Sequence, residues 1–212
     1  MTLRNVLTLA LASSAISLGA ANATTITDPV GDILPSFLGA QAGDLDVTSF
    51  SVGFNDATQI FSLSATLAGA IDPTGGALYV IGVDTGAGPI APFANIGAPN
   101  VRFNQVVLVR NDGTASVGAT ALTAAVNGDT FTVDVPLSAL PSTGFAPDRY
   151  GFNLWPRVGL GLNSQISDFA PDNSLVSAVP EPGTWALMIS GVALTGFALR
   201  RARSGARTAL TA

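Results

Sequence analysis

The chain has 212 residues, 14 of them acidic and nine basic, and it contains no Cys, no His and no Lys. These absences exclude thiol nucleophiles, Ser–His pairs, Schiff-base lysines, disulfides and histidine-ligated zinc or copper. All 14 acids lie between Asp28 and Glu181 beside only four Arg, so this stretch carries a net charge of −10. Such a charge excludes nucleic acid as an expected partner and permits divalent cations.

The first 23 residues have the pattern of a secretory signal peptide. Arg4 gives a positive start, residues 6–18 are apolar, and Ala21 and Ala23 form a small-x-small cleavage site. The pattern predicts an N-terminal signal helix, export, and a mature chain that begins at Thr24. The alternative is a permanent N-terminal anchor.

Closely spaced aspartates follow the predicted cleavage site, with Gly31 and Gly43 beside them. Calcium takes about six to eight oxygen ligands from carboxylates and loop carbonyls, and Asp with Gly in loops suits that chemistry. We therefore consider a calcium site here. The alternative is that these side chains cap turns and keep the protein soluble. The candidate ligands are Asp28, Asp32, Asp44, Asp46 and, if its strand end lies nearby, Asp84.

Residues 24–170 are predicted to form one all-β domain, an antiparallel β-sandwich of the jelly-roll or immunoglobulin-like type. Apolar residues alternate in several short runs, and residues 78–83 are continuously apolar, as in a strand buried on both faces. Turn residues at 111–113 and 127–129 indicate hairpins. The alternating runs are 50–54, 61–67, 101–109, 131–135 and 150–154.

A carbohydrate ligand would need an exposed aromatic ring on which a sugar can stack. Trp155 is the candidate for that role, because Pro156 is expected to end its strand and leave the ring at the surface. The alternative is that Trp155 belongs to the core. The Gly- and Pro-rich segment 85–99 is long enough to be a binding loop.

Three segments of the middle domain, 28–32, 44–52 and 78–84, resemble the β-sandwiches related to family 9 carbohydrate-binding modules and DOMON domains. They provide an Asp-Pro-x-Gly-Asp opening, an Asp-initiated strand, and an Asp at the end of a tyrosine-bearing strand. The resemblance implies a ligand-binding β-sandwich. DOMON members that bind haem use His or Met pairs, and a chain without His is not expected to hold haem.

An enzyme would have to use carboxylate pairs. Asp44 and Asp46 would lie on one face of a strand about 6.6 Å apart, near the separation of about 6.5–9.5 Å in inverting glycosidases. Neighbouring carboxylates of this kind are more often a solvated strand edge. A non-enzymatic protein is therefore expected, with a carboxylate-based glycoside hydrolase as an alternative.

The C-terminal segment has the order of a membrane-sorting tail. A linker over residues 171–183 holds Val179, Pro180, Glu181 and Pro182, and an apolar stretch follows it. Residues 184–199 are predicted to form a transmembrane helix, and residues 200–212 a basic tail that stays cytoplasmic. The predicted stop-transfer residues are Arg200, Arg201, Arg203 and Arg207.

This tail resembles the PEP-CTERM sorting signal, also known as the ice-binding protein C-terminal domain. The resemblance implies a Gram-negative, exopolysaccharide-producing source and an exosortase that recognises Pro180-Glu181-Pro182 and processes the tail. We therefore expect an inner-membrane-anchored precursor that becomes a cell-surface or biofilm-matrix protein. Its role would be structural or adhesive, with exopolysaccharide as a partner. The alternative is a calcium-dependent carbohydrate-binding module.

Overall fold

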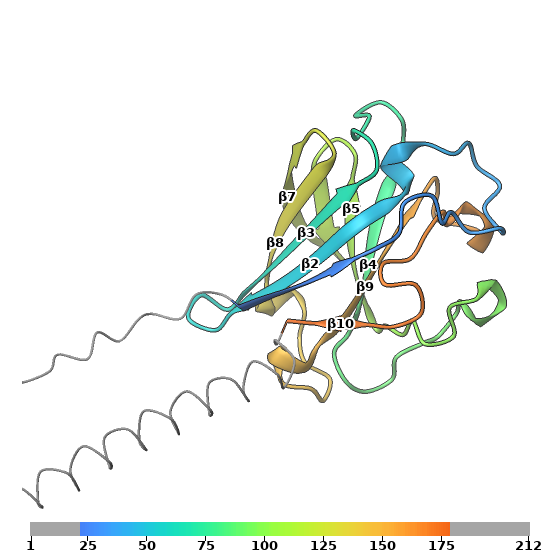
Figure 1. Ribbon diagram of the computed structural model, residues 1–212. Coiled ribbons are helices and arrows are strands. Elements are labelled where there is room, and N and C mark those ends of the chain that lie inside the picture. Colours follow the sequence, from blue (N-terminus) through green and yellow to red (C-terminus); the bar gives the residue numbers. More distant parts are fainter. Residues whose placement is uncertain (1–21, 179–212) are drawn as a thin grey trace, which may run out of the picture.

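The computed structural model describes residues 22–178, and residues 1–21 and 179–212 lie outside the described part. The described chain is almost entirely strand and loop, with five short 3₁₀ turns (Figure 1). The strands are β1 (Asn22–Thr27), β2 (Val47–Asn55), β3 (Ile60–Leu67), β4 (Leu78–Asp84), β5 (Gln105–Arg110), β6 (Thr114–Val117), β7 (Thr120–Asn127), β8 (Thr130–Pro136), β9 (Gly151–Arg157) and β10 (Val176–Ser177).

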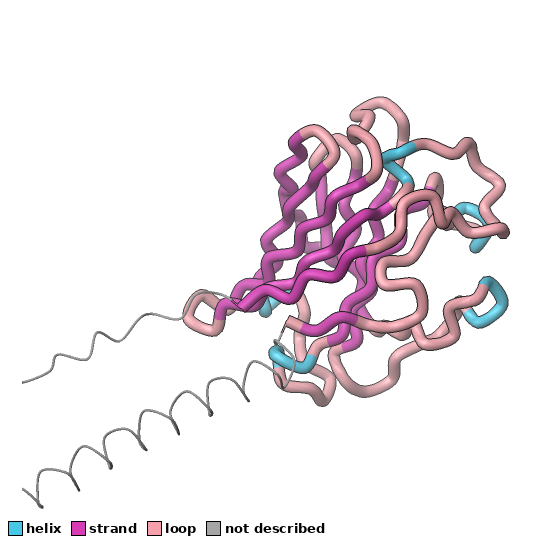
Figure 2. Tube along the Cα trace, viewed as in Figure 1, coloured by secondary structure: helices cyan, strands magenta, loops and turns pink. Residues whose placement is uncertain are grey.

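The ten strands form one antiparallel sheet in the order β1-β2-β3-β8-β7-β6-β5-β4-β9-β10. The sheet folds over on itself, so that β1-β2-β3-β8 face β5-β4-β9 in two layers (Figure 2). β7 joins the layers, because its first half pairs with β6 and its second half with β8. The two edge strands, β1 and β10, contact each other, so the sheet is nearly closed.

The predicted all-β, antiparallel class is confirmed. The finer prediction of a jelly-roll or immunoglobulin-like sandwich is not shown, because β7 hydrogen-bonds to both layers and joins them into one nearly closed sheet. Both predicted hairpins are present. Gly113 and Gly128 adopt φ values of 83° and 63° between β5 and β6 and between β7 and β8, a conformation that glycine adopts at little cost.

The core lies between the two layers, where alternate residues of each strand point inward. Phe61 of β3 stacks on Tyr150 with ring centroids 5.4 Å apart, and it packs against Phe152 of β9 at 5.2 Å. Tyr79 of β4 stacks on Phe131 of β8 at 4.9 Å. These pairs join the two layers and explain the burial of the alternating residues.

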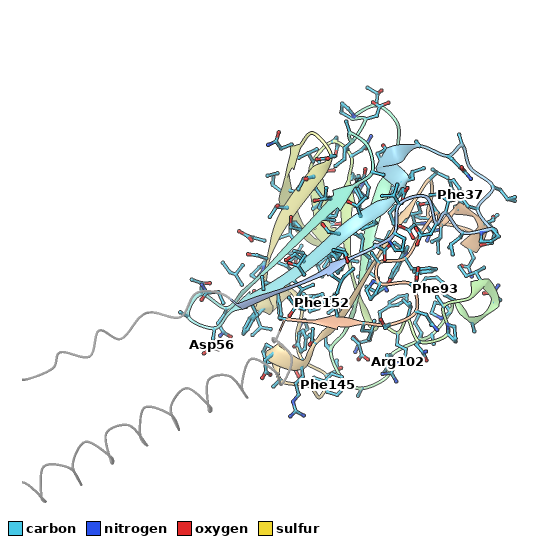
Figure 3. All side chains as sticks on the ribbon, in the orientation of Figure 1. Phe37, Asp56, Phe93, Arg102, Phe145 and Phe152 are labelled. Atoms are coloured by element: carbon cyan, nitrogen blue, oxygen red, sulfur yellow. The ribbon has the colours of Figure 1, made fainter. Side chains whose placement is uncertain are left out.

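A second apolar cluster lies on the outer face of β4 and β9. Trp155 packs there against Phe93, Phe103 and Phe169 with ring centroids 5.0–6.2 Å apart. The loop that follows β4 supplies Phe93, which Figure 3 shows on the loop side of the sheet, away from Phe152. The loop between β4 and β5 therefore covers part of the outer face of the sheet.

Trp155 is only 2% exposed, so the alternative that it belongs to the core is confirmed, and its predicted role as a surface platform for sugars is wrong. The reason lies in the chain around it. β9 continues through Pro156 to Arg157, and every residue of β9 is buried, because the core between the layers covers its inner face and the loop segments cover its outer face.

No helix within residues 22–178 is long and apolar enough to cross a membrane. The predicted transmembrane helix at 184–199, the basic tail and nearly all of the predicted signal peptide lie outside the described residues. The ordered domain extends beyond the predicted 24–170 at both ends. Asn22 and Ala23 pair with β2, and β10 falls within the segment predicted as a linker.

Candidate metal centre

Four aspartates from opposite ends of the domain come together beside the edge strands. Asp28 and Asp32 follow β1, and Asp168 and Asp172 precede β10. One carboxylate oxygen of each lies within 4.8 Å of the others. We call these four residues the aspartate centre. Two ligands on opposite sides of a calcium ion are about 4.6–5.2 Å apart, twice the calcium–oxygen distance, so one ion fits between them.

Backbone and side-chain hydrogen bonds hold the two segments in place. The Asp168 carboxylate accepts from the Val47 N–H at 2.9 Å, which fixes it against the start of β2. The Ser167 hydroxyl donates to the Leu45 carbonyl at 2.7 Å. The Leu34 N–H donates to the Ser167 carbonyl at 2.7 Å. The Leu34–Ser167 bond thus joins the loop after β1 directly to the segment before β10, and the other two bonds attach that segment to the 3₁₀ turn at Gly43–Leu45 and to β2.

The carboxylates are crowded, and those of Asp28 and Asp168 are poorly solvated. Burial, followed by the charges of Asp168 and Asp32, raises the pKa of Asp28 from 3.8 to about 8. Burial likewise raises the pKa of Asp168 to about 7, against hydrogen bonds that lower it. The one ion pair within residues 22–178 joins Arg102 to Asp84. The mutual repulsion at the centre is therefore not offset by an ion pair in this part of the chain.

Three carboxylate oxygens at this place are buried without a hydrogen-bond partner: Asp28 Oδ2, Asp32 Oδ1 and Asp46 Oδ1. Asp46 is only 6% exposed, and its other oxygen accepts from the Gly31 N–H at 2.8 Å, within the loop that carries Asp28 and Asp32. Its charge acts on both of those carboxylates. A buried anionic oxygen without a partner costs free energy, and a cation would supply the missing interaction.

The donor set indicates which cation fits. Every candidate ligand is a carboxylate, and calcium prefers such hard oxygen ligands. Zinc usually takes Cys or His ligands, which this chain lacks. Asp172 is exposed, which leaves room at the ion for water or a ligand oxygen. A cavity of about 240 Å³ lies next to Asp46, lined also by Gly31, Ile33, Gln41, Ala42 and Gly43.

The predicted ligands thus separate into two groups. Asp28 and Asp32 belong to the centre, and Asp46 contacts its loop. Asp44 accepts instead from the Asp72 N–H at 3.4 Å. Burial raises the pKa of Tyr79, and the charge of Asp44 raises it further. Asp84 accepts from the Gly86 N–H at 3.0 Å and faces Arg102 at 3.9 Å.

Asp44 and Asp46, the carboxylates of the glycosidase alternative, are both buried and bond to different segments. Asp168 and Asp172 were not among the predicted ligands. A signal for them exists, because Asp28 and Asp32 have the same spacing as Asp168 and Asp172, and a proline lies within each pair. The two Asp-x-x-x-Asp segments also enclose the strands β2 to β9.

One comparison bears on the tail. Residues 178–203 match the PEP-CTERM protein-sorting motif. The match confirms the predicted sorting signal and supports sorting to the cell surface by an exosortase. It does not extend into the β domain, and no family match supports the resemblance to DOMON domains and carbohydrate-binding modules. A search of curated proteins finds no significant match to this chain.

Proposed function

We propose that this chain is an exported surface protein that an exosortase sorts by its PEP-CTERM tail, and that its β domain binds calcium at the aspartate centre. Its role is structural or adhesive, in contact with exopolysaccharide in the extracellular matrix. The observation that carries the calcium proposal is the convergence of Asp28, Asp32, Asp168 and Asp172 beside unpartnered buried oxygens. Calcium-binding extracellular modules have dissociation constants of about 10⁻⁴–10⁻³ M, within the range of extracellular calcium.

The proposed course of sorting follows from the tail. The signal peptide directs export with cleavage before Thr24, and residues 184–199 anchor the precursor in the inner membrane with the arginine cluster on the cytoplasmic side. The exosortase then acts at Pro180-Glu181-Pro182. The motif match begins at residue 178, directly after β10, which supports a sorting segment joined to the folded domain without a long spacer.

Calcium is expected to raise the melting temperature of the full chain, purified in a mild detergent, over its value in chelator. A ligand at 100 times its dissociation constant stabilises the native state by about 2.7 kcal/mol, or about 5–11 °C for a domain of this size. Asp172→Asn should abolish most of this rise. The exposed Asp148→Asn, a matched change outside the centre, should retain it. Equal melting of the wild type in calcium and in chelator would remove the calcium proposal.

Glu181→Ala is expected to block processing of the tail, because the proposed exosortase site is the Pro-Glu-Pro triplet. The measurement is an immunoblot of membrane and surface fractions, in which the unprocessed precursor should accumulate in the membrane. Thr184→Ala, three residues further along the same tail, is the control and should be processed like the wild type. Normal processing of the Glu181 variant would contradict the sorting proposal.

A second candidate function is calcium-dependent carbohydrate binding. The cavity of about 240 Å³ next to Asp46 supports it, because a sugar there could direct hydroxyl oxygens toward an ion at the centre. This candidate differs from the first in requiring a bound polysaccharide. Retention on polysaccharide columns that is lost in chelator separates it from a purely structural role.

A further inference from the structure

The aspartate centre lies where the chain closes on itself. Asp28 follows the last residue of β1 directly, and Asp172 precedes β10 by four residues. β1 and β10 are the two edges of the sheet and contact each other. We call this junction the seam. An ion at the centre would therefore bond to both sides of the seam at once.

The last strand on the C-terminal side of the seam is short, although the segment before it is bonded to the sheet at Ala170 and to Asn100 at Asn173. β10 has two residues, and its pairing with β9 consists of Val176 with Phe152 and Ser177 with Gly151. The Asn153 side-chain amide adds hydrogen bonds to two carbonyls of the segment between Asp168 and β10. A pairing this short is marginal by itself, and charge repulsion among the carboxylates acts against it.

We infer that a divalent cation closes the seam between β1 and β10 and thereby fixes the start of the sorting tail against the folded domain. The inference rests on the calcium binding proposed above. It is also supported by Asp46, which is buried, has an unpartnered oxygen and bonds to the loop of Asp28 and Asp32. Without the cation, the carboxylates separate, β10 leaves β9, and Ala178 is no longer held by the sheet.

Closure of the seam by the cation would affect the order of events during sorting. The motif match starts at residue 178, so a closed seam holds the proximal end of the sorting motif next to the domain. The seam closes once the protein reaches a compartment with calcium near the dissociation constant of the site. The cation thus determines how far the sorting motif can extend from the domain toward a membrane-embedded enzyme.

The test is hydrogen exchange of the full chain in mild detergent, followed by mass spectrometry, with calcium and with chelator. Peptides over residues 22–34 and 168–178 are expected to exchange about tenfold more slowly in calcium, because the ion suppresses local opening of the seam. Peptides over β6 and β7 should change far less. Asp172→Asn should remove the difference at the seam, and Asp148→Asn should preserve it.

Calcium titration by calorimetry on the same samples distinguishes the two proposals. Calcium binding together with slower exchange at the seam supports the inference. Calcium binding with no change in exchange, or with an equal change in all strands, overturns the seam inference and leaves the calcium site in place. The absence of binding heat and of any exchange difference overturns both.

Discussion

Replacing Trp155 by alanine is expected to lower the free energy of unfolding by about 3–5 kcal/mol, the usual cost of removing a buried aromatic side chain. Trp155 is the centre of the outer apolar cluster and contacts Phe93, Phe103 and Phe169. It also lies over Gly82 of β4, where a Cβ atom would come within 2.5 Å of the indole. Neighbouring side chains cannot fill the space that the indole leaves, so a cavity remains.

The measurement is urea unfolding of the wild type and the variant in the same calcium buffer. Phe145→Ala is the control, because Phe145 is 39% exposed on a loop, and its loss should change stability by about 0.5 kcal/mol or less. If Trp155→Ala unfolded at the same urea concentration as the wild type, the outer cluster would not be part of the stabilising core.

Asp28→Asn is expected to have opposite effects with and without calcium. In chelator at pH 8 the variant should melt at a higher temperature than the wild type, because it removes one of the mutually repelling carboxylates. In calcium it should melt at a lower temperature, because one ligand is neutral, and the affinity should fall by about tenfold or more. Asp148→Asn should behave like the wild type in both buffers.

The pH dependence of stability in chelator independently tests the direction of the Asp28→Asn effect. Burial, and the charges of Asp168 and Asp32 after it, raise the pKa of Asp28 from 3.8 to about 8. The folded protein therefore retains a proton that the unfolded chain has released, and stability falls as the pH rises from about 4 to 8. In chelator, the stability advantage of Asp28→Asn over the wild type should shrink toward pH 4. At that pH Asp28 is protonated in the folded wild type, so residue 28 is uncharged in both proteins. An advantage that grew toward low pH would contradict the raised pKa.

Much of the fold follows from alternating apolar residues, and the exceptions have physical reasons. The runs that became β2, β3, β4, β8 and β9 bury one or both faces, so their periodicity is visible in the sequence. The turn after β7 was predicted, but no apolar alternation marks β7 itself, because this strand crosses from one layer to the other and buries only Ala124. β1 was assigned in part to the signal peptide, since its first two residues fall within the cleavage site.

Only two of the four residues of the aspartate centre could be predicted from the sequence. Asp28 and Asp32 are close in sequence and next to a glycine, which suggests a calcium loop by itself. Asp168 and Asp172 join them only because the sheet returns to its first strand after ten strands, and local patterns do not encode that closure. The choice between surface and core stayed open for Trp155 for a similar reason. Its burial depends on Phe93, which lies about 60 residues away in a loop of glycine and proline.

The pairing of distant strands has a consequence for how the protein acquires its structure. β3 pairs with β8 and β4 with β9, and the Asp168 carboxylate bonds to the Val47 N–H across 121 residues. Domains with many contacts between distant residues fold slowly, on the scale of milliseconds to seconds, because long loops must close first. The last of these contacts cannot form until nearly the whole domain has been synthesised. Slow pairing of this kind suits the export proposed above, because a chain that is still unfolded can be threaded through a translocation pore and can complete its native pairing afterwards.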